Sequence, residues 1–107
     1  MAAKNITAQE YQELMNAGRP VLVDYWAPWC SYCRRISTAY DKVAAQYEGQ
    51  LEVVKINIDE EPLLANQEQI EIIPTLVLYR GEKALGSIVA PESKAAIDAF
   101  IRETLVQ

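Results

Sequence analysis

The chain has 107 residues, of which half are apolar, and it carries a formal net charge of −5. A chain of this length buries one hydrophobic core and is too short for two, so we expect a single domain over residues 1–107. The acidic balance argues against a nucleic-acid partner, because proteins that neutralise phosphates usually carry a basic patch. No stretch approaches the roughly twenty apolar residues of a membrane-spanning helix, and residues 1–10 lack the apolar core of a secretory signal. We therefore expect no membrane partner and a cytoplasmic location.

The first predicted elements are a helix over residues 8–17 and a strand over residues 21–26. Thr7 and Glu10 have the spacing of a capping box, and Gly18 is typical of a residue that ends a helix. The strand, VLVDYW, is almost continuous in apolar and strand-favouring residues, which indicates that both of its faces are covered. We expect it at the centre of a sheet.

The second predicted helix starts at the two cysteines of the chain. From Cys33 to Tyr47 the apolar residues recur at three- and four-residue steps, which predicts one buried helix face, and Gly49 is expected to close the helix. Cys30 and Cys33 therefore lie at the N-terminus of this helix.

The second half of the chain predicts strands, a short helix, a hairpin and a final helix. In chain order these are a strand over 51–58, a helix over 62–69, a strand over 75–79, a weaker edge strand over 83–89, and a helix that begins near residues 91–93. Strands that alternate with helices indicate an α/β fold with a mixed sheet.

The C-x-x-C spacing at a helix start favours thiol chemistry. The first amides of a helix have no intrahelical partners, and the aligned peptide dipoles place partial positive charge there, which stabilises a thiolate. Cys30, on the cap side, is expected to have the lower pKa and to attack a partner's disulfide. Cys33, one turn inward, would then resolve the mixed disulfide.

Two other readings of the cysteine pair compete with this one. The chain has no histidine and no second cysteine pair, so a zinc site within it would need carboxylates, and an iron–sulfur cluster would have to be shared between two chains. Free cysteines also pack as small hydrophobic residues. We favour thiol exchange and expect no metal site.

Asp24 stands in the middle of the apolar strand VLVDYW. Burying an ionised carboxylate is unfavourable unless it is paired, so its pKa should rise toward neutrality, which makes Asp24 a candidate proton acceptor. Alternatively, it is hydrogen-bonded to backbone at a strand end or paired with Lys55 across the sheet.

Taken together, YWAPWCSYC, the Asp24 that precedes it, Lys55 in VVKINID and the segment IIPTLVLY resemble the thioredoxin family. The resemblance extends over essentially the whole chain, with each element in the family's order. It implies an α/β thioredoxin fold, in which four helices flank a mixed five-stranded sheet.

The resemblance also implies roles for particular residues. Its catalytic set would be the nucleophile Cys30, the resolving thiol Cys33, and the proton shuttle Asp24 with Lys55 near it. It implies a cis bond before Pro74 and a backbone at Ile73 that pairs with the substrate peptide. The rim that contacts substrate would comprise Trp29, Tyr32, Ile73, Pro74 and Ala90, although a tryptophan such as Trp29 can also be a core residue.

Two departures from the family pattern stand at this rim. The family has Gly-Pro between its cysteines, whereas this chain has Ser31-Tyr32. Because proline lacks an N–H, Tyr32 restores a backbone donor that we expect to point toward the Cys30 sulfur and to make the pair more oxidising by tens of millivolts. Ala90 replaces a usual glycine, and its methyl group would narrow the approach to the site.

The function that the sequence favours is a thiol-disulfide oxidoreductase that reduces protein disulfides. By the resemblance, an NADPH-dependent thioredoxin reductase would regenerate it, and it would need no bound cofactor beyond the redox-active Cys30–Cys33 disulfide. The alternatives are a disulfide isomerase or oxidase with a more oxidising potential, and a non-catalytic module that binds an extended peptide or a shared iron–sulfur cluster.

Overall fold

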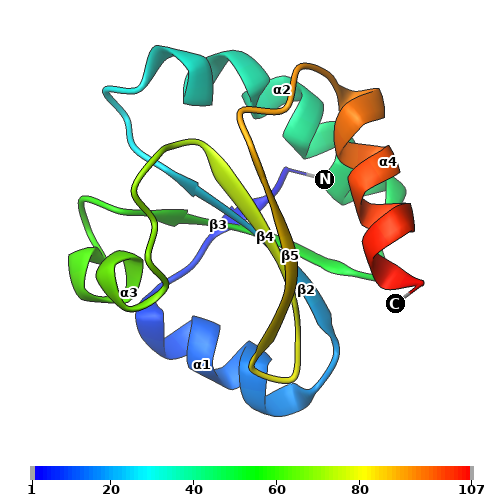
Figure 1. The fold of residues 1–107 in the computed structure, drawn as a ribbon, viewed down its shortest axis with the longest axis horizontal. Coiled ribbons are helices and arrows are strands. Elements are labelled where there is room, and N and C mark those ends of the chain that lie inside the picture. The colour runs from blue at the N-terminus through cyan, green and yellow to red at the C-terminus, as the bar shows by residue number, and fades with distance from the viewer. Residues whose placement is uncertain (1, 107) are drawn as a thin grey trace.

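A central sheet lies between two pairs of helices in the computed structural model, which describes residues 2–106 (Figure 1). Helices α2 and α4 cover one face of the sheet, and α1 and α3 cover the other. In chain order the elements are β1 (Lys4–Asn5), α1 (Ala8–Ala17), β2 (Pro20–Trp26), α2 (Ser31–Gln46), β3 (Glu52–Asn57), α3 (Pro62–Gln67), β4 (Thr75–Arg80), β5 (Lys83–Val89) and α4 (Lys94–Leu105).

Strand β2 is the middle strand of the sheet, as its apolar sequence predicted. The strand order is β1-β3-β2-β4-β5, with β2 parallel to β3 and antiparallel to β4. In this register Asp24 lies opposite Lys55 on β3 and Leu76 on β4. Asp24 therefore lies on the middle strand of the sheet, which has a neighbouring strand on each side.

The sequence pattern missed one strand, β1. Its two residues pair in parallel with β3, with Lys4 opposite Val54 and Asn5 opposite Lys55. Two residues are too short to show any hydrophobic period, so only the family resemblance implied a fifth strand. Strand β3 is also one residue shorter at each end than the predicted span of 51–58.

The helix ends follow the predicted chemistry at some positions and not at others. The Thr7–Glu10 capping box forms, and Gly18 caps α1 with a φ of 77°. In contrast, α2 ends at Gln46, and Gly49, with a φ of 83°, lies in the turn that follows rather than at the helix end. Helix α3 ends at Gln67, two residues before the predicted end.

Alternating residues of β2 serve two separate apolar clusters. Val21 and Val23 pack on the side of α1 and α3, whereas Leu22 packs on the side of α2 and α4. Since successive strand side chains point to opposite faces, Asp24 shares the α2 and α4 face with Leu22. The buried carboxyl group therefore faces the layer that carries the cysteine pair.

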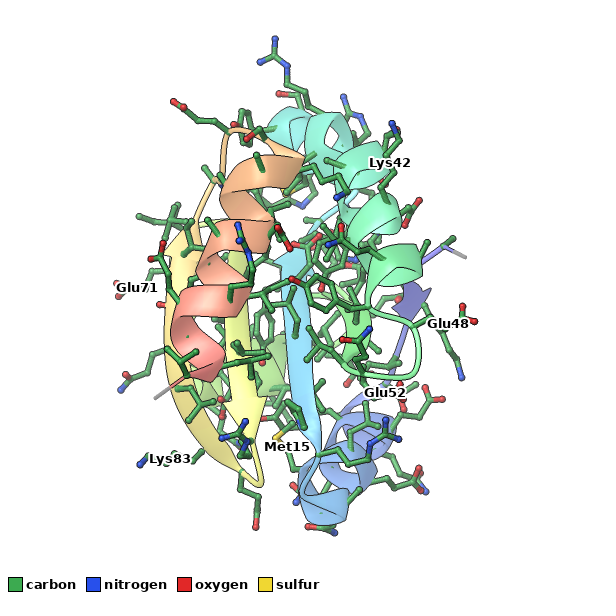
Figure 2. The ribbon with its side chains drawn as sticks, turned by 90° about the vertical axis from the view of Figure 1, so that its right-hand side faces the viewer. Met15, Lys42, Glu48, Glu52, Glu71 and Lys83 are labelled. Carbon is green, nitrogen blue, oxygen red and sulfur yellow. A yellow bond between two sulfur atoms is a disulfide. The ribbon has the colours of Figure 1, made fainter. Side chains whose placement is uncertain are left out.

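Apart from Asp24, the charged side chains lie at the outside of the molecule. In Figure 2 the side chains of Lys42, Glu48 and Lys83 project away from the protein body, whereas Met15 lies inside, between α1 and the sheet. Among the helices in residues 2–106, none combines the length and the apolar character needed to cross a membrane.

Candidate active site

Cys30 and Cys33 occupy the first turn of α2, where the sequence predicted them. Cys30 is the N-cap residue, with an extended backbone, and its Sγ accepts a hydrogen bond of 3.2 Å from the N–H of Cys33. The two residues form a disulfide, and their Cα atoms are 5.3 Å apart. The structure therefore shows the oxidised state of the pair.

The two sulfurs differ in accessibility. Cys30 is 9% exposed and Cys33 is 3% exposed, so Cys30 is the cysteine nearer to solvent. Its Sγ also lies 3.9 Å from the carbonyl oxygen of Ile73. The Ile73 backbone therefore lies beside the Cys30 sulfur.

The Ile73–Pro74 loop joins the site through its backbone. The peptide bond before Pro74 is cis, as the resemblance implied. The carbonyl of Pro74 accepts a hydrogen bond of 2.9 Å from the N–H of Ala90, which ties the end of β5 to this loop. Ile73, Pro74 and Ala90 thus come together beside Cys30, although they are far apart in the sequence.

Ala90 adopts a backbone conformation that favours glycine. Its φ is 46°, in the left-handed region, where a Cβ atom crowds the following carbonyl. This conformation explains why a glycine is suited to the position. Alanine keeps the same backbone path at a cost in strain.

Trp29 belongs to the surface of the site and not to the core. Its side chain is 66% exposed, and its indole N–H donates a hydrogen bond of 3.0 Å to a carboxylate oxygen of Asp59. The alternative that Trp29 is a core residue is therefore wrong. The exposed ring offers an apolar surface directly before Cys30.

The backbone of Tyr32 does not have the contact that the sequence predicted. The hydrogen bond to Cys30 Sγ comes from the N–H of Cys33, at the third helical position, and not from the N–H of Tyr32. An N-cap side chain reaches back to either the second or the third amide of the helix, and here the third is aligned. The Tyr32 side chain instead donates its hydroxyl to the carbonyl of Pro91, at 3.0 Å.

Asp24 is buried without a compensating partner. It is 1% exposed, and its Oδ1 has no hydrogen-bond partner within the described part of the chain. Burial raises the pKa of Asp24 to about 7, while the positive charge of Lys55 acts in the opposite direction. The expected shift toward neutrality is confirmed, and the carboxyl group can exchange a proton near neutral pH.

Lys55 lies near Asp24 in register but does not form an ion pair with it. Its Nζ lies 4.4 Å from the centre of the Trp26 ring, a cation–π geometry. The ion pairs found in residues 2–106 are elsewhere, namely Lys4–Glu10 and Arg102–Asp98. The alternative in which Lys55 pairs with Asp24 is therefore wrong for this state.

Two further residues shape the loop before Cys30, although the sequence predicted only positive charge at Arg34 and no role for Asp59. Asp59 accepts the Trp29 indole hydrogen bond, and the Arg34 guanidinium donates to the carbonyl of Pro28 at 2.7 Å. A signal for Asp59 was available, because β2 and β3 are parallel and the residues that follow them meet at one edge of the sheet. Arg34 had no comparable signal.

In residues 2–106 no group of three or more His, Cys, Asp or Glu side chains is arranged to hold a metal ion.

Comparison with known proteins assigns the chain to a family. The thioredoxin family model matches residues 2–103. Thioredoxin 1 of Nostoc sp. (strain PCC 7120) is 39% identical over 105 residues, which is 97% of this chain and 98% of that protein. The thioredoxin of Porphyra purpurea is 35% identical over 104 residues, with 96% of this chain and 97% of that protein covered.

A solved structure supports the fold separately. It comes from a study of the thiol resolving mechanism in yeast mitochondrial 1-Cys peroxiredoxin via glutathione and thioredoxin systems. The TM-score is 0.82 at 22% sequence identity, and 94% of each chain is covered. The family match, the similar thioredoxins and the Cys30–Cys33 pair support one function, that of a thiol-disulfide oxidoreductase that reduces protein disulfides. This chain belongs to the thioredoxin family.

Proposed function

We propose that Cys30 is the sulfur that attacks the disulfide of a partner protein and that Cys33 is the resolving thiol. The observation that carries this assignment is the position of Cys30, the helix N-cap whose Sγ accepts the Cys33 amide. Amides at that position stabilise a thiolate. Cys30 is also the more exposed of the two cysteines, so a partner reaches it first.

The reaction then balances as two thiol exchanges. The Cys30 thiolate attacks one sulfur of the partner's disulfide, that S–S bond breaks, and the other partner sulfur leaves as a thiolate and takes up a proton. Cys33 next loses its proton and attacks Cys30 Sγ. The mixed disulfide breaks, the partner leaves as a dithiol, and the Cys30–Cys33 disulfide seen in the structure is formed.

Asp24 is the proposed acceptor of the Cys33 proton. Its pKa of about 7 means that a carboxylate and a carboxylic acid are both populated at neutral pH, which suits a group that takes and returns a proton. Its position on the α2 side of β2 supports this role. Lys55 would favour the charged form of Asp24 without binding it directly.

The proposed substrate surface is the rim around Cys30. The backbone of Ile73 would pair with an extended peptide on one side of the target disulfide, and the exposed Trp29 would cover its other side. Pro74 and Ala90 would form the base of this surface, where the Ala90 N–H donates a hydrogen bond to the Pro74 carbonyl. Tyr32 belongs to the same rim through its contact with Pro91.

The proposed electron donor is an NADPH-dependent thioredoxin reductase, and the proposed location is the cytoplasm. The similar proteins that are named thioredoxins support a partner of this class, because each turnover leaves the cysteines oxidised and requires two electrons to reset them. No bound cofactor is needed for the exchange itself, since the cysteines carry the electrons. Disulfide-containing proteins are the substrates.

A pair of serine variants tests the assignment of the two cysteines. Cys33→Ser should accumulate a mixed disulfide with a disulfide-containing protein such as insulin, because nothing resolves it, and mass spectrometry would detect the adduct. Cys30→Ser is the matched control, because it also replaces a cysteine sulfur by oxygen. It should trap no mixed disulfide. Trapping by Cys30→Ser and not by Cys33→Ser would reverse the assignment.

The wild-type protein provides the activity measurement. It should accelerate the reduction of insulin by dithiothreitol, and each serine variant should lose this acceleration. If the wild-type protein did not accelerate the reaction, the proposed function would be wrong.

A further inference from the structure

The side chain of Tyr32 points toward the core and not out into solvent. Tyr32 shares a helix face with Ile36 and Tyr40, four and eight residues further along α2. It is half-buried and packs against the apolar cluster on the α2 and α4 side of the sheet. The guanidinium of Arg35 lies 6.0 Å from the centre of its ring. The ring is therefore held in place, and its hydroxyl has a fixed direction.

That hydroxyl contacts the segment that connects β5 to α4. It donates to the carbonyl of Pro91, a buried residue 59 positions away in the sequence, at 3.0 Å. We call residues 90–93 the rim segment. Tyr32 thus connects the dipeptide between the two cysteines to a part of the chain that the C-x-x-C motif does not include.

The rim segment is also bound to the cis-proline loop. The N–H of Ala90 donates to the carbonyl of Pro74 at 2.9 Å. Two neighbouring residues of the segment are therefore each held by a distant part of the chain, Pro91 by Tyr32 and Ala90 by Pro74. Because the left-handed φ of 46° at Ala90 is unfavourable for a residue with a Cβ atom, this backbone path depends on contacts that hold it.

We propose that Tyr32 is a positioning residue for protein substrates, whose hydroxyl fixes the rim segment against the cis-proline loop. This proposal rests on the proposed disulfide-reductase function. The hydrogen bond keeps Ala90 on Pro74 and so keeps the substrate rim in one arrangement. Tyr32 acts on the binding of an extended peptide and not on the exchange of sulfur atoms, since its hydroxyl is bound to Pro91.

Removal of one oxygen atom tests the proposal. Tyr32→Phe keeps the ring and its packing and loses only the hydroxyl. Tyr47→Phe is the matched control, because it removes a hydroxyl from the other end of α2, where Tyr47 donates to Asp98. Both variants are assayed with insulin and with a small disulfide, oxidised 2-mercaptoethanol, which has no peptide backbone to pair with the rim.

The expected result is a split between the two substrates. Tyr32→Phe should raise the KM for insulin by roughly two- to tenfold, the range that one neutral hydrogen bond supports, and leave kcat within about twofold. The rate constant with oxidised 2-mercaptoethanol should stay unchanged. Tyr47→Phe should change neither the kinetic constants for insulin nor the rate constant for the small disulfide. An equal loss with both substrates would show that Tyr32 acts on the thiol chemistry and would overturn the proposal.

Hydrogen exchange gives a second readout that does not depend on activity. The Ala90 amide should exchange roughly two- to tenfold faster in Tyr32→Phe than in the wild-type protein and at the wild-type rate in Tyr47→Phe, because the segment opens more often. Unchanged exchange at Ala90 in Tyr32→Phe would overturn the proposal, even if the KM for insulin rises. Failure of the wild-type protein to reduce insulin would instead contradict the proposed function, and the exchange rates would still show whether Tyr32 holds the segment.

Discussion

Asp24 places a carboxyl group at the centre of the sheet, 1% exposed, beneath the helix that carries both cysteines. Its burial and its raised pKa followed from the sequence, because an aspartate inside a continuous apolar strand has no route to water. The position of the Lys55 ammonium group could not be inferred from the sequence. The sequence shows which residues can lie opposite each other on two strands, but not that Lys55 turns its charge onto the Trp26 ring.

The raised pKa of Asp24 makes the stability of the protein depend on pH. The pKa is about 7 in the folded protein against an ordinary aspartate value of 3.8, so between these pH values the folded state binds more protons than the unfolded state. The free energy of unfolding therefore falls as the pH rises from about 4 to about 7. Above that range Asp24 is ionised in both states, and its contribution no longer changes with pH.

Replacement of Asp24 by asparagine should remove this dependence. Relative to the wild-type protein, Asp24→Asn should gain a few kcal/mol of unfolding free energy as the pH rises from about 4 to about 8, since each pKa unit corresponds to about 1.4 kcal/mol. Urea denaturation at several pH values measures it. Glu48→Gln, which removes an exposed carboxylate, is the control. A difference between Asp24→Asn and wild type that does not grow with pH would contradict the raised pKa.

At the scale of elements, the start of α1 shows how much local chemistry can predict. Thr7 and Glu10 identified the helix start from the sequence, and the structure shows the Thr7 Oγ1 accepting the Glu10 N–H at 3.1 Å. Such contacts lie three residues apart, so a sequence displays both partners together. Strand β1 and the end of α2 were not predictable in this way, because their bounds depend on pairing with distant strands and on the turn that follows.

The Thr7 cap should make a measurable contribution to stability. Thr7→Ala removes the oxygen that accepts the Glu10 N–H and should lower the free energy of unfolding by about 1 kcal/mol. Thr38→Ala makes the same chemical change at an exposed position inside α2 and should be neutral or stabilising by a few tenths of a kcal/mol. Denaturant unfolding of both variants measures the difference. Equal effects at the two positions would contradict a capping role for Thr7.

Across the whole molecule, strands β2, β3 and β4 each contribute side chains to both apolar layers. Leu22 contacts the cluster under α2 and α4, whereas its neighbours Val21 and Val23 belong to the cluster under α1 and α3. The sequence predicted a central strand from its unbroken apolar run. Contacts between distant segments, such as Tyr32 with Pro91, have no local pattern and required the structure.

Because β2 serves both layers, we predict that the chain unfolds as one domain in one cooperative transition. Leu22→Ala, at a position that is 0% exposed, should lower the free energy of unfolding by about 2–5 kcal/mol and should shift far- and near-ultraviolet circular dichroism transitions together. Leu63→Ala, at a position that is 84% exposed, is the matched control and should change it by less than about 0.5 kcal/mol. Two separated transitions would contradict a single domain.

The proposed chemistry requires that α2 holds the Cys30 sulfur as a thiolate, ready to attack. The most direct measurement is a pH titration of the reduced protein by ultraviolet thiolate absorbance, with Cys30→Ser and Cys33→Ser used to assign each step. We predict that Cys30 ionises well below the ordinary cysteine value of about 8.5 and before Cys33. A Cys30 thiol that titrates at the ordinary value or above it, or after Cys33, would contradict its role as the attacking sulfur.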